Sequence, residues 1–130
     1  LHMHFERFTS YGRGYRAVCS IRTNAQLGFN RGSIHRFGLQ DGYAILFYSK
    51  EDTVIGIKIG VGDTEEGATR LIVKQNNAFI SGRSFLEYYN IPYSGETRQY
   101  EAEWSDEHEM ILVDLKKPVK RTRDRAKNAE

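Results

Sequence analysis

The chain of 130 residues carries the same order of expected elements twice. In the first half the pattern predicts strands over 18–23 and 26–29, a helix over 30–39, and a strand hairpin over 43–49 and 54–59. In the second half it predicts strands over 71–75 and 78–80, a helix over 82–89, and strands over 97–104 and 110–115. This repeated order predicts a mainly β fold with short helices, built from two ββαββ repeats.

The two halves match in two registers. A shift of 52 positions without a gap pairs Asn24 with Asn76, Arg31 with Arg83, Ile34 with Leu86, Phe37 with Tyr89, and Leu39 with Ile91. After four extra residues around 92–95, a shift of 56 pairs Tyr48 with Trp104, Ile55 with Ile111, Ile57 with Val113, and Ile59 with Leu115. We therefore expect the matched apolar side chains to be buried, namely Ile34, Phe37, Leu39, Ile57, Leu86, Tyr89, Ile91 and Val113.

Local signals define the ends of both helices. Asn30 is a favourable N-cap for the first helix, and Gly38 suits the left-handed position after it. Ser81 and Asn90 are expected to cap the second helix at its two ends. The run Tyr43–Tyr48 is apolar at both alternating sets of positions, which predicts a central strand covered on both faces.

The first half resembles the AbrB/MazE/SpoVT-like swapped-hairpin family, whose pattern is roughly G-x-ϕ-x-I-P, a short helix, L-G-I-x-x-G-D and a hairpin. Gly38, Leu39 and Gly42 fall where that pattern has L-G-I-x-x-G, and the second half follows it more loosely through Ile80, Tyr89, Asn90 and Ile91. The chain departs from the family at its proline, replaced by Asn30 and by Ser81 or Gly82, and at its aspartate, replaced by Tyr43.

The resemblance implies that two copies exchange hairpins to close one swapped-hairpin-like β-barrel, here as a covalent pseudo-dimer. The expected division is a flexible basic arm over 1–17, the barrel over 18–115 with repeats 18–59 and 70–115, and a basic, disordered tail over 116–130. In such a barrel each half alone leaves strand edges unpaired, and the two halves together pair them.

Charge is segregated along the chain although the net charge is only +2. Residues 1–40 carry +5, residues 41–115 carry −8, and residues 116–130 carry +5. Clustered Lys and Arg attract phosphate backbones, so the ends are expected to meet an anionic partner.

Together, the charge and the resemblance predict a DNA-binding transcriptional regulator. Arginines of the arm and of the first strand and loop of each half would contact duplex DNA, with the tail as a nonspecific anchor. The expected contact residues are Arg13, Arg16, Arg22, Arg31, Arg70, Lys74, Arg83, Lys116, Lys117, Lys120, Arg121, Arg123 and Arg125.

Other classes of function stay open. The acidic middle face would suit a protein-interaction or inhibitor module. An RNA or single-strand binder could stack bases on the arm and hold phosphates there, using Phe5, Phe8, Tyr11, Tyr15, Arg7, Arg13 and Arg16. A homo-oligomer is a further expectation that the sequence leaves open.

Enzymatic activity is not expected, because the sequence contains no catalytic motif. A metal is not expected either, because the spacing of His4, His35 and His108 is not that of metal ligands. No cofactor is expected. Cys19, the single cysteine, is expected to be a buried apolar residue in a reducing, cytoplasmic protein without a membrane span. Leu1-His2-Met3 resembles a cloning remnant, because His-Met is what a common restriction site leaves before a start codon.

Overall fold

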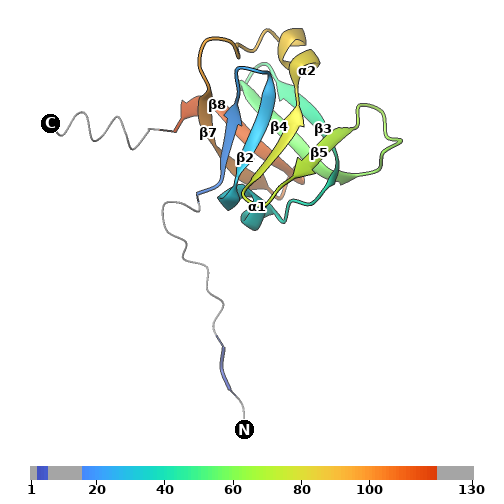
Figure 1. Cartoon of the computed structure of the whole chain (residues 1–130), viewed down its shortest axis with the longest axis vertical. Helices are drawn as coiled ribbons and strands as arrows, with labels where there is room; N and C mark the ends of the chain where they lie inside the picture. The colour runs from blue at the N-terminus through green and yellow to red at the C-terminus, as the bar shows by residue number, and fades with distance from the viewer. Residues whose placement is uncertain (1–2, 6–15, 120–130) are drawn as a thin grey trace, which may run out of the picture.

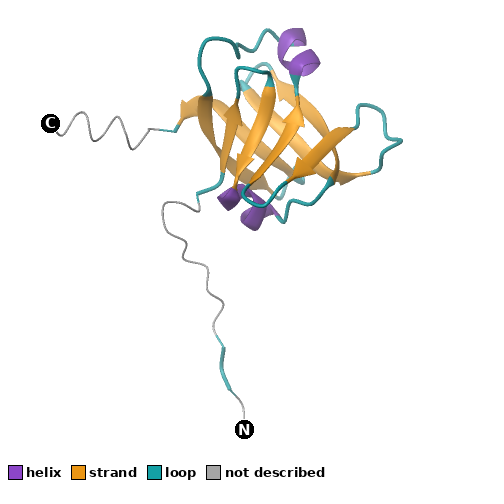
Figure 2. Ribbon diagram, in the orientation of Figure 1, coloured by secondary structure: helices purple, strands orange, loops and turns teal. Residues whose placement is uncertain are grey.

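The computed structural model describes residues 3–5 and 16–119, which form a closed antiparallel barrel of eight strands with two short helices (Figures 1 and 2). The elements of the first half are β1 (Val18–Ile21), β2 (Gln26–Asn30), α1 (Arg31–Phe37), β3 (Gly42–Ser49) and β4 (Val54–Val61). Those of the second half are β5 (Thr69–Val73), β6 (Asn77–Ser81), α2 (Arg83–Tyr88), β7 (Arg98–Ser105) and β8 (Met110–Pro118). The expected mainly β fold with short helices is confirmed.

The order of strands around the barrel is β1-β2-β6-β5-β3-β4-β8-β7, and β7 pairs with β1 to close the ring. Four ladders join the two halves, namely β2–β6, β3–β5, β4–β8 and β1–β7. In the β2–β6 ladder Gly28 lies opposite Phe79, and in the β4–β8 ladder Gly56 lies opposite Leu112. Closure leaves no strand of the barrel with an unpaired edge.

The core fills the inside of the barrel. An eight-stranded barrel is just wide enough for side chains to fill its interior. The fully buried apolar side chains point inward at alternating positions of their strands, as the pleat requires. They include Cys19, Ile21, Leu27, Phe29, Ile55, Ile57, Leu71, Ile80, Ile111 and Val113. The expected burial of Cys19 is confirmed.

The N-terminus of α1 is tied to β1 through Asn30. Its side-chain oxygen accepts hydrogen bonds from the backbone N–H of Ser33 at 2.9 Å and of Val18 at 3.0 Å. The buried Ser33 hydroxyl donates to the Val18 carbonyl at 3.0 Å. The helix ends at Gly38, which has φ 61, so both expected caps of this helix are confirmed.

Ser81, the expected N-cap of α2, is wrong. The N-cap is Gly82, without a side-chain hydrogen bond, and Ser81 is the last residue of β6. At the other end Asn90 has φ 55, and the Ile91 amide donates to the Leu86 carbonyl at 2.8 Å. Asn tolerates this left-handed conformation better than most residues.

The gapless shift of 52 between the halves is also wrong. Leu27 and Phe29 are buried on β2, and the buried residues of β6 are Ala78 and Ile80, 51 positions later. The difference arises in the preceding turns. The Arg22 amide donates to the carbonyl of residue 26, whereas the Lys74 amide donates to the carbonyl of residue 77, so the second turn is one residue shorter. The helix starts, Arg31 and Arg83, return to a spacing of 52.

β3 is not covered on both faces. Ala44 is buried and Leu46 and Tyr48 pack against the core, whereas the Phe47 side chain is 44% exposed on the outside. A closed barrel fully covers only the inner face of a strand, and of the outer apolar positions of β3 Phe47 is exposed, whereas Tyr43 and Ile45 are partly buried.

Burial of the matched apolar residues is complete at five positions and partial at three. Leu39, Ile57, Leu86, Ile91 and Val113 are buried. The other three, Ile34, Phe37 and Tyr89, are half-buried and pack against the core from outside it. They lie on or next to the helices, which cover the barrel ends and keep one side toward solvent (Figure 2).

Candidate nucleic-acid interface

Four adjacent strands, β1, β2, β6 and β5, form one wall of the barrel, which faces the viewer in Figure 1. No Asp or Glu occurs in these four strands or in the turns 22–25 and 74–76 that join them, all of which the structure describes. The outward positions include Arg70 on β5, and Arg22 and Lys74 lie at the ends of β1 and β5. We call this the cationic wall. With strands about 4.8 Å apart, its four strands span roughly 14 Å.

Arg22 lies flat on the cationic wall. Its Nη1 donates to Gln26 Oε1 at 3.0 Å and its Nη2 to Asn77 Oδ1 at 2.6 Å. The guanidinium covers Gly28 so closely that a Cβ there would overlap it. A side chain at this position would therefore displace Arg22, which gives Gly28 a reason to be glycine.

The partners of Arg22 are neutral amides, and no carboxylate is paired with it among the described residues. Two of its five N–H groups are used in these bonds. The sequence pattern did not single out Gln26 or Asn77. A glycine inside the short strand β2 was the one signal that something approaches the backbone closely there.

Arg31 and Arg83 start α1 and α2, which follow β2 and β6. Because β2 and β6 are antiparallel, the two arginines lie at opposite ends of the cationic wall. Arg83 is held by the Tyr93 hydroxyl, to which its Nη1 donates at 3.1 Å, and by the Asn24 carbonyl at 3.3 Å. Its guanidinium lies 5.6 Å from the centre of the Tyr93 ring, in reach of a cation–π interaction.

The remaining expected contact residues lie elsewhere. Arg16 forms an ion pair with Glu101 on β7. Lys116 and Lys117 belong to β8, not to a separate tail, because that strand continues to Pro118. Lys116 Nζ lies 2.9 Å from Asp114 Oδ1, and its hydrogen bonds lower the pKa of that carboxyl. Outside the described residues lie Arg13, Lys120, Arg121, Arg123 and Arg125, and with them Arg7, Phe8, Tyr11 and Tyr15 of the arm.

Comparison with known proteins finds no matching family model, no similar curated protein and no similar solved structure. Within residues 3–5 and 16–119, no helix has the length and apolar character needed to cross a lipid bilayer.

Proposed function

We propose that the protein is a transcriptional regulator of the swapped-hairpin type that binds duplex DNA through the cationic wall. The observation that carries this proposal is the wall itself, on which Arg22, Arg70 and Lys74 lie among strands free of carboxylates. A duplex binds such a surface because Lys and Arg displace counterions from its phosphates. Arg31 and Arg83 would extend the contact at the two ends of the wall.

The internal duplication is part of the proposal, and three features support it. If each strand from β1 to β4 is exchanged with the strand four places later, from β5 to β8, every strand still has the same neighbours in the ring. The amide of Leu39 donates to the Ile34 carbonyl, and the equivalent amide of Ile91 donates to that of Leu86. The ladders β2–β6 and β4–β8 each pair a strand with its own counterpart, as a twofold axis through both ladders requires.

Sequence preference would come from Arg22 and its amide neighbours. Arginine can donate two hydrogen bonds to the edge of guanine, and Asn or Gln can form two with adenine. Gln26 and Asn77 hold the guanidinium in the plane of the wall without neutralising its charge. Because its N–H groups lie in the plane of the wall, Arg22 would turn outward from Gln26 and Asn77 to donate to the edge of a base.

Fluorescence polarisation with labelled duplex DNA, at two salt concentrations, tests the proposal. Selection from a random-sequence duplex pool first supplies the preferred site. Arg22→Gln should weaken binding to that site by roughly 1–3 kcal/mol if the side chain reads a base. Arg22→Lys should keep affinity for mixed-sequence DNA and lose much of the preference, because lysine cannot form the paired contact.

Lys58→Gln is the matched control, since Lys58 is an exposed cation on β4, in the opposite wall. This variant should bind as the unchanged protein does. If mixed-sequence duplex does not bind even at low salt, or if Lys58→Gln weakens binding as much as Arg22→Gln, the proposal is wrong.

A further inference from the structure

The two halves of the cationic wall differ at its centre. Gly28 of β2 and Phe79 of β6 form the middle pair of the β2–β6 ladder. The proposed twofold axis would pass between these two residues and exchange them. A glycine in one half of the wall therefore takes the place that a large aromatic residue takes in the other half.

The half of the wall that contains Phe79 is apolar at its centre. Phe79 is half-buried and points outward, because the residues before and after it on β6 are buried inside the barrel. Ile72 of β5 lies directly opposite Phe79, so it shares the same outer face, and it is also half-buried. These two apolar side chains lie where the other half has Ser20 opposite Gly28.

The half of the wall that contains Gly28 presents a cation at its centre. The Arg22 guanidinium lies over Gly28, so close that a Cβ has no room there. Lys74 follows β5 as Arg22 follows β1, and it is exposed, but Phe79 takes the place of the glycine in that half. The wall thus offers N–H donors on one side of its centre and apolar surface on the other.

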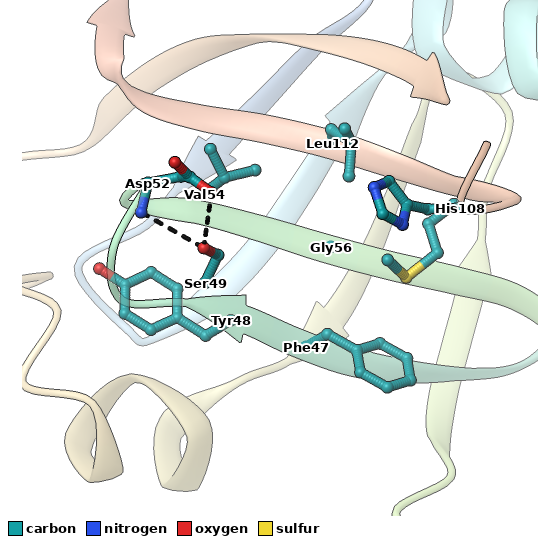
Figure 3. Close-up of a pocket in the computed structure, with 9 residues that line it drawn as sticks. Phe47, Tyr48, Ser49, Asp52, Val54, Gly56, His108 and Leu112 are labelled. Atoms are coloured by element: carbon teal, nitrogen blue, oxygen red, sulfur yellow. Dashed lines mark hydrogen bonds between the residues drawn. The ribbon is translucent and has the colours of Figure 1, made fainter. Parts of the chain in front are cut away.

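The opposite wall has a similar pair of residues without the cation. In the β4–β8 ladder Gly56 lies opposite Leu112, with the side chain of Phe47 on the neighbouring strand (Figure 3). A Cβ at Gly56 would lie 2.8 Å from Met110 Cε. Methionine thus takes the place over Gly56 that arginine takes over Gly28, and this wall serves as an internal comparison.

Two cations flank the apolar pair along β5. Arg70 and Lys74 are exposed, two positions before and two positions after Ile72. Four residues of a strand span about 13 Å, close to the roughly 12 Å width of the major groove. Between them, Asp41 Oδ1 accepts a hydrogen bond from the Val73 amide at 2.7 Å, and this carboxylate disfavours a phosphate there. The apolar pair therefore suits the base edges of a groove whose phosphates contact the two cations.

We propose that the cationic wall reads a DNA site without twofold symmetry, in which Arg22 contacts a guanine and the pair Phe79 and Ile72 contacts the methyl group of a thymine. This inference rests on the proposed DNA binding. Two equal halves would read an inverted repeat. Here one half offers N–H donors, which suit guanine, and the other offers apolar side chains, which suit the thymine methyl group.

The spacing of the strands limits the distance between the two bases. Gly28 is one strand away from Phe79 and two strands away from Ile72. Neighbouring strands are about 4.8 Å apart, and successive base pairs about 3.4 Å. The guanine and the thymine are therefore expected within about three base pairs of each other.

Selection from a random-sequence duplex pool, followed by polarisation titrations, tests this inference. The selected site should not be an inverted repeat, and loss of preference in Arg22→Gln locates the guanine. Replacing the nearby thymine by deoxyuridine removes only the methyl group. This replacement should weaken binding of the unchanged protein by about fourfold, the factor expected for one buried methyl group. Phe79→Ser should bind both duplexes equally, whereas Arg22→Gln should keep the fourfold ratio.

Phe47→Ser is the matched control, because Phe47 is a phenylalanine on the outer face of the opposite wall (Figure 3). It should keep the fourfold ratio, and circular dichroism checks that each variant is folded. An inverted-repeat site, or equal binding of both duplexes by the unchanged protein, overturns the inference and leaves the proposed DNA binding intact. A ratio that persists in Phe79→Ser or is lost in Phe47→Ser also overturns it. If no duplex binds at low salt, the proposed function is wrong as well.

Discussion

At the scale of single residues, the structure gives different hydrogen-bond partners to residues of the same type, which a sequence pattern does not distinguish. Asn30 and Asn77 lie opposite each other in the β2–β6 ladder. Asn30 joins the start of α1 to β1, whereas Asn77 holds Arg22 on the cationic wall. The same residue type thus stabilises a helix end in one half and orients a cation in the other.

Cys19 gives a prediction at this scale. The side chain is buried on β1, and this burial raises the pKa of its thiol from 9.0 to about 12. Between those values the unfolded chain loses the proton and the folded chain keeps it. The free energy of unfolding should therefore be unaffected by Cys19 below pH 9 and fall above it, by about 1.4 kcal/mol per pH unit.

Urea unfolding between pH 8 and pH 10.5 measures this slope. Cys19→Ala lowers the free energy of unfolding at every pH but removes this contribution to the slope, and Tyr100, whose pKa burial also raises, remains in both proteins. Equal slopes for the two proteins would contradict the prediction.

At the scale of elements, the two helices differ in how deeply they are buried. Leu86 of α2 is fully buried, whereas Ile34 of α1, which the shift of 52 pairs with Leu86, is half-buried. Phe85 and Tyr89 pack with Tyr48 of β3, with ring centres 6.3 Å and 5.0 Å from it, and so form an aromatic cluster at the α2 end of the barrel.

We predict that Leu86→Ala lowers the free energy of unfolding by about 2–5 kcal/mol, the usual cost of emptying a buried leucine site. Ile34→Ala should cost less, because part of that side chain is already in water. For the same reason Phe37→Ala should cost less than the roughly 3–5 kcal/mol of a fully buried phenylalanine. Urea unfolding of the three variants ranks these costs. An Ile34→Ala cost equal to that of Leu86→Ala would show that α1 is packed more tightly than its exposure indicates.

At the scale of the whole molecule, the barrel gathers the four strands without carboxylates in one wall, although β5 and β6 come from the acidic middle of the chain. The other wall carries charges of both signs, with Glu101, Glu103 and Asp114 and with Lys58, Lys116 and Lys117. The ring order β1-β2-β6-β5 produces this grouping, because it interleaves strands from both halves of the chain.

The C-terminal segment gives a prediction at this scale, which rests on the proposed DNA binding. The chain is held as far as Val119, whose amide donates to the Gln99 carbonyl at 2.8 Å. Removing residues 120–130 should lower the slope of log affinity against log salt by about 0.9 for each phosphate that this segment neutralises. The order of preference among DNA sequences should not change, because binding to phosphates carries no sequence information.

Polarisation titrations of the shortened and full chains, at several salt concentrations and on two duplexes, measure both quantities. Thermal unfolding of the shortened chain serves as the control for an intact barrel. A slope that does not change, or a reversed preference between the two duplexes, would contradict an anchoring role for the tail.

The sequence by itself determined the features that depend on neighbouring residues. Alternating apolar residues placed the strands to within a few positions, Asn30 and Gly38 defined α1, and the apolar run around Cys19 predicted its burial. These features follow from local propensity, capping and solvent exclusion, which act over a few residues. The barrel itself was predicted from the resemblance to the swapped-hairpin family.

Only the tertiary structure decided what depends on strands that are distant in the chain. Pairing of β2 with β6 brings Asn77 to Arg22, and closure of the ring leaves Phe47 exposed on the outer face of β3. The inward residues of β6 also differ from those that a shift of 52 predicts. The reason is that a turn shorter by one residue moves every following side chain of the strand to the other face. Such long-range pairing depends on the geometry of the closed ring, which no local pattern of residues encodes.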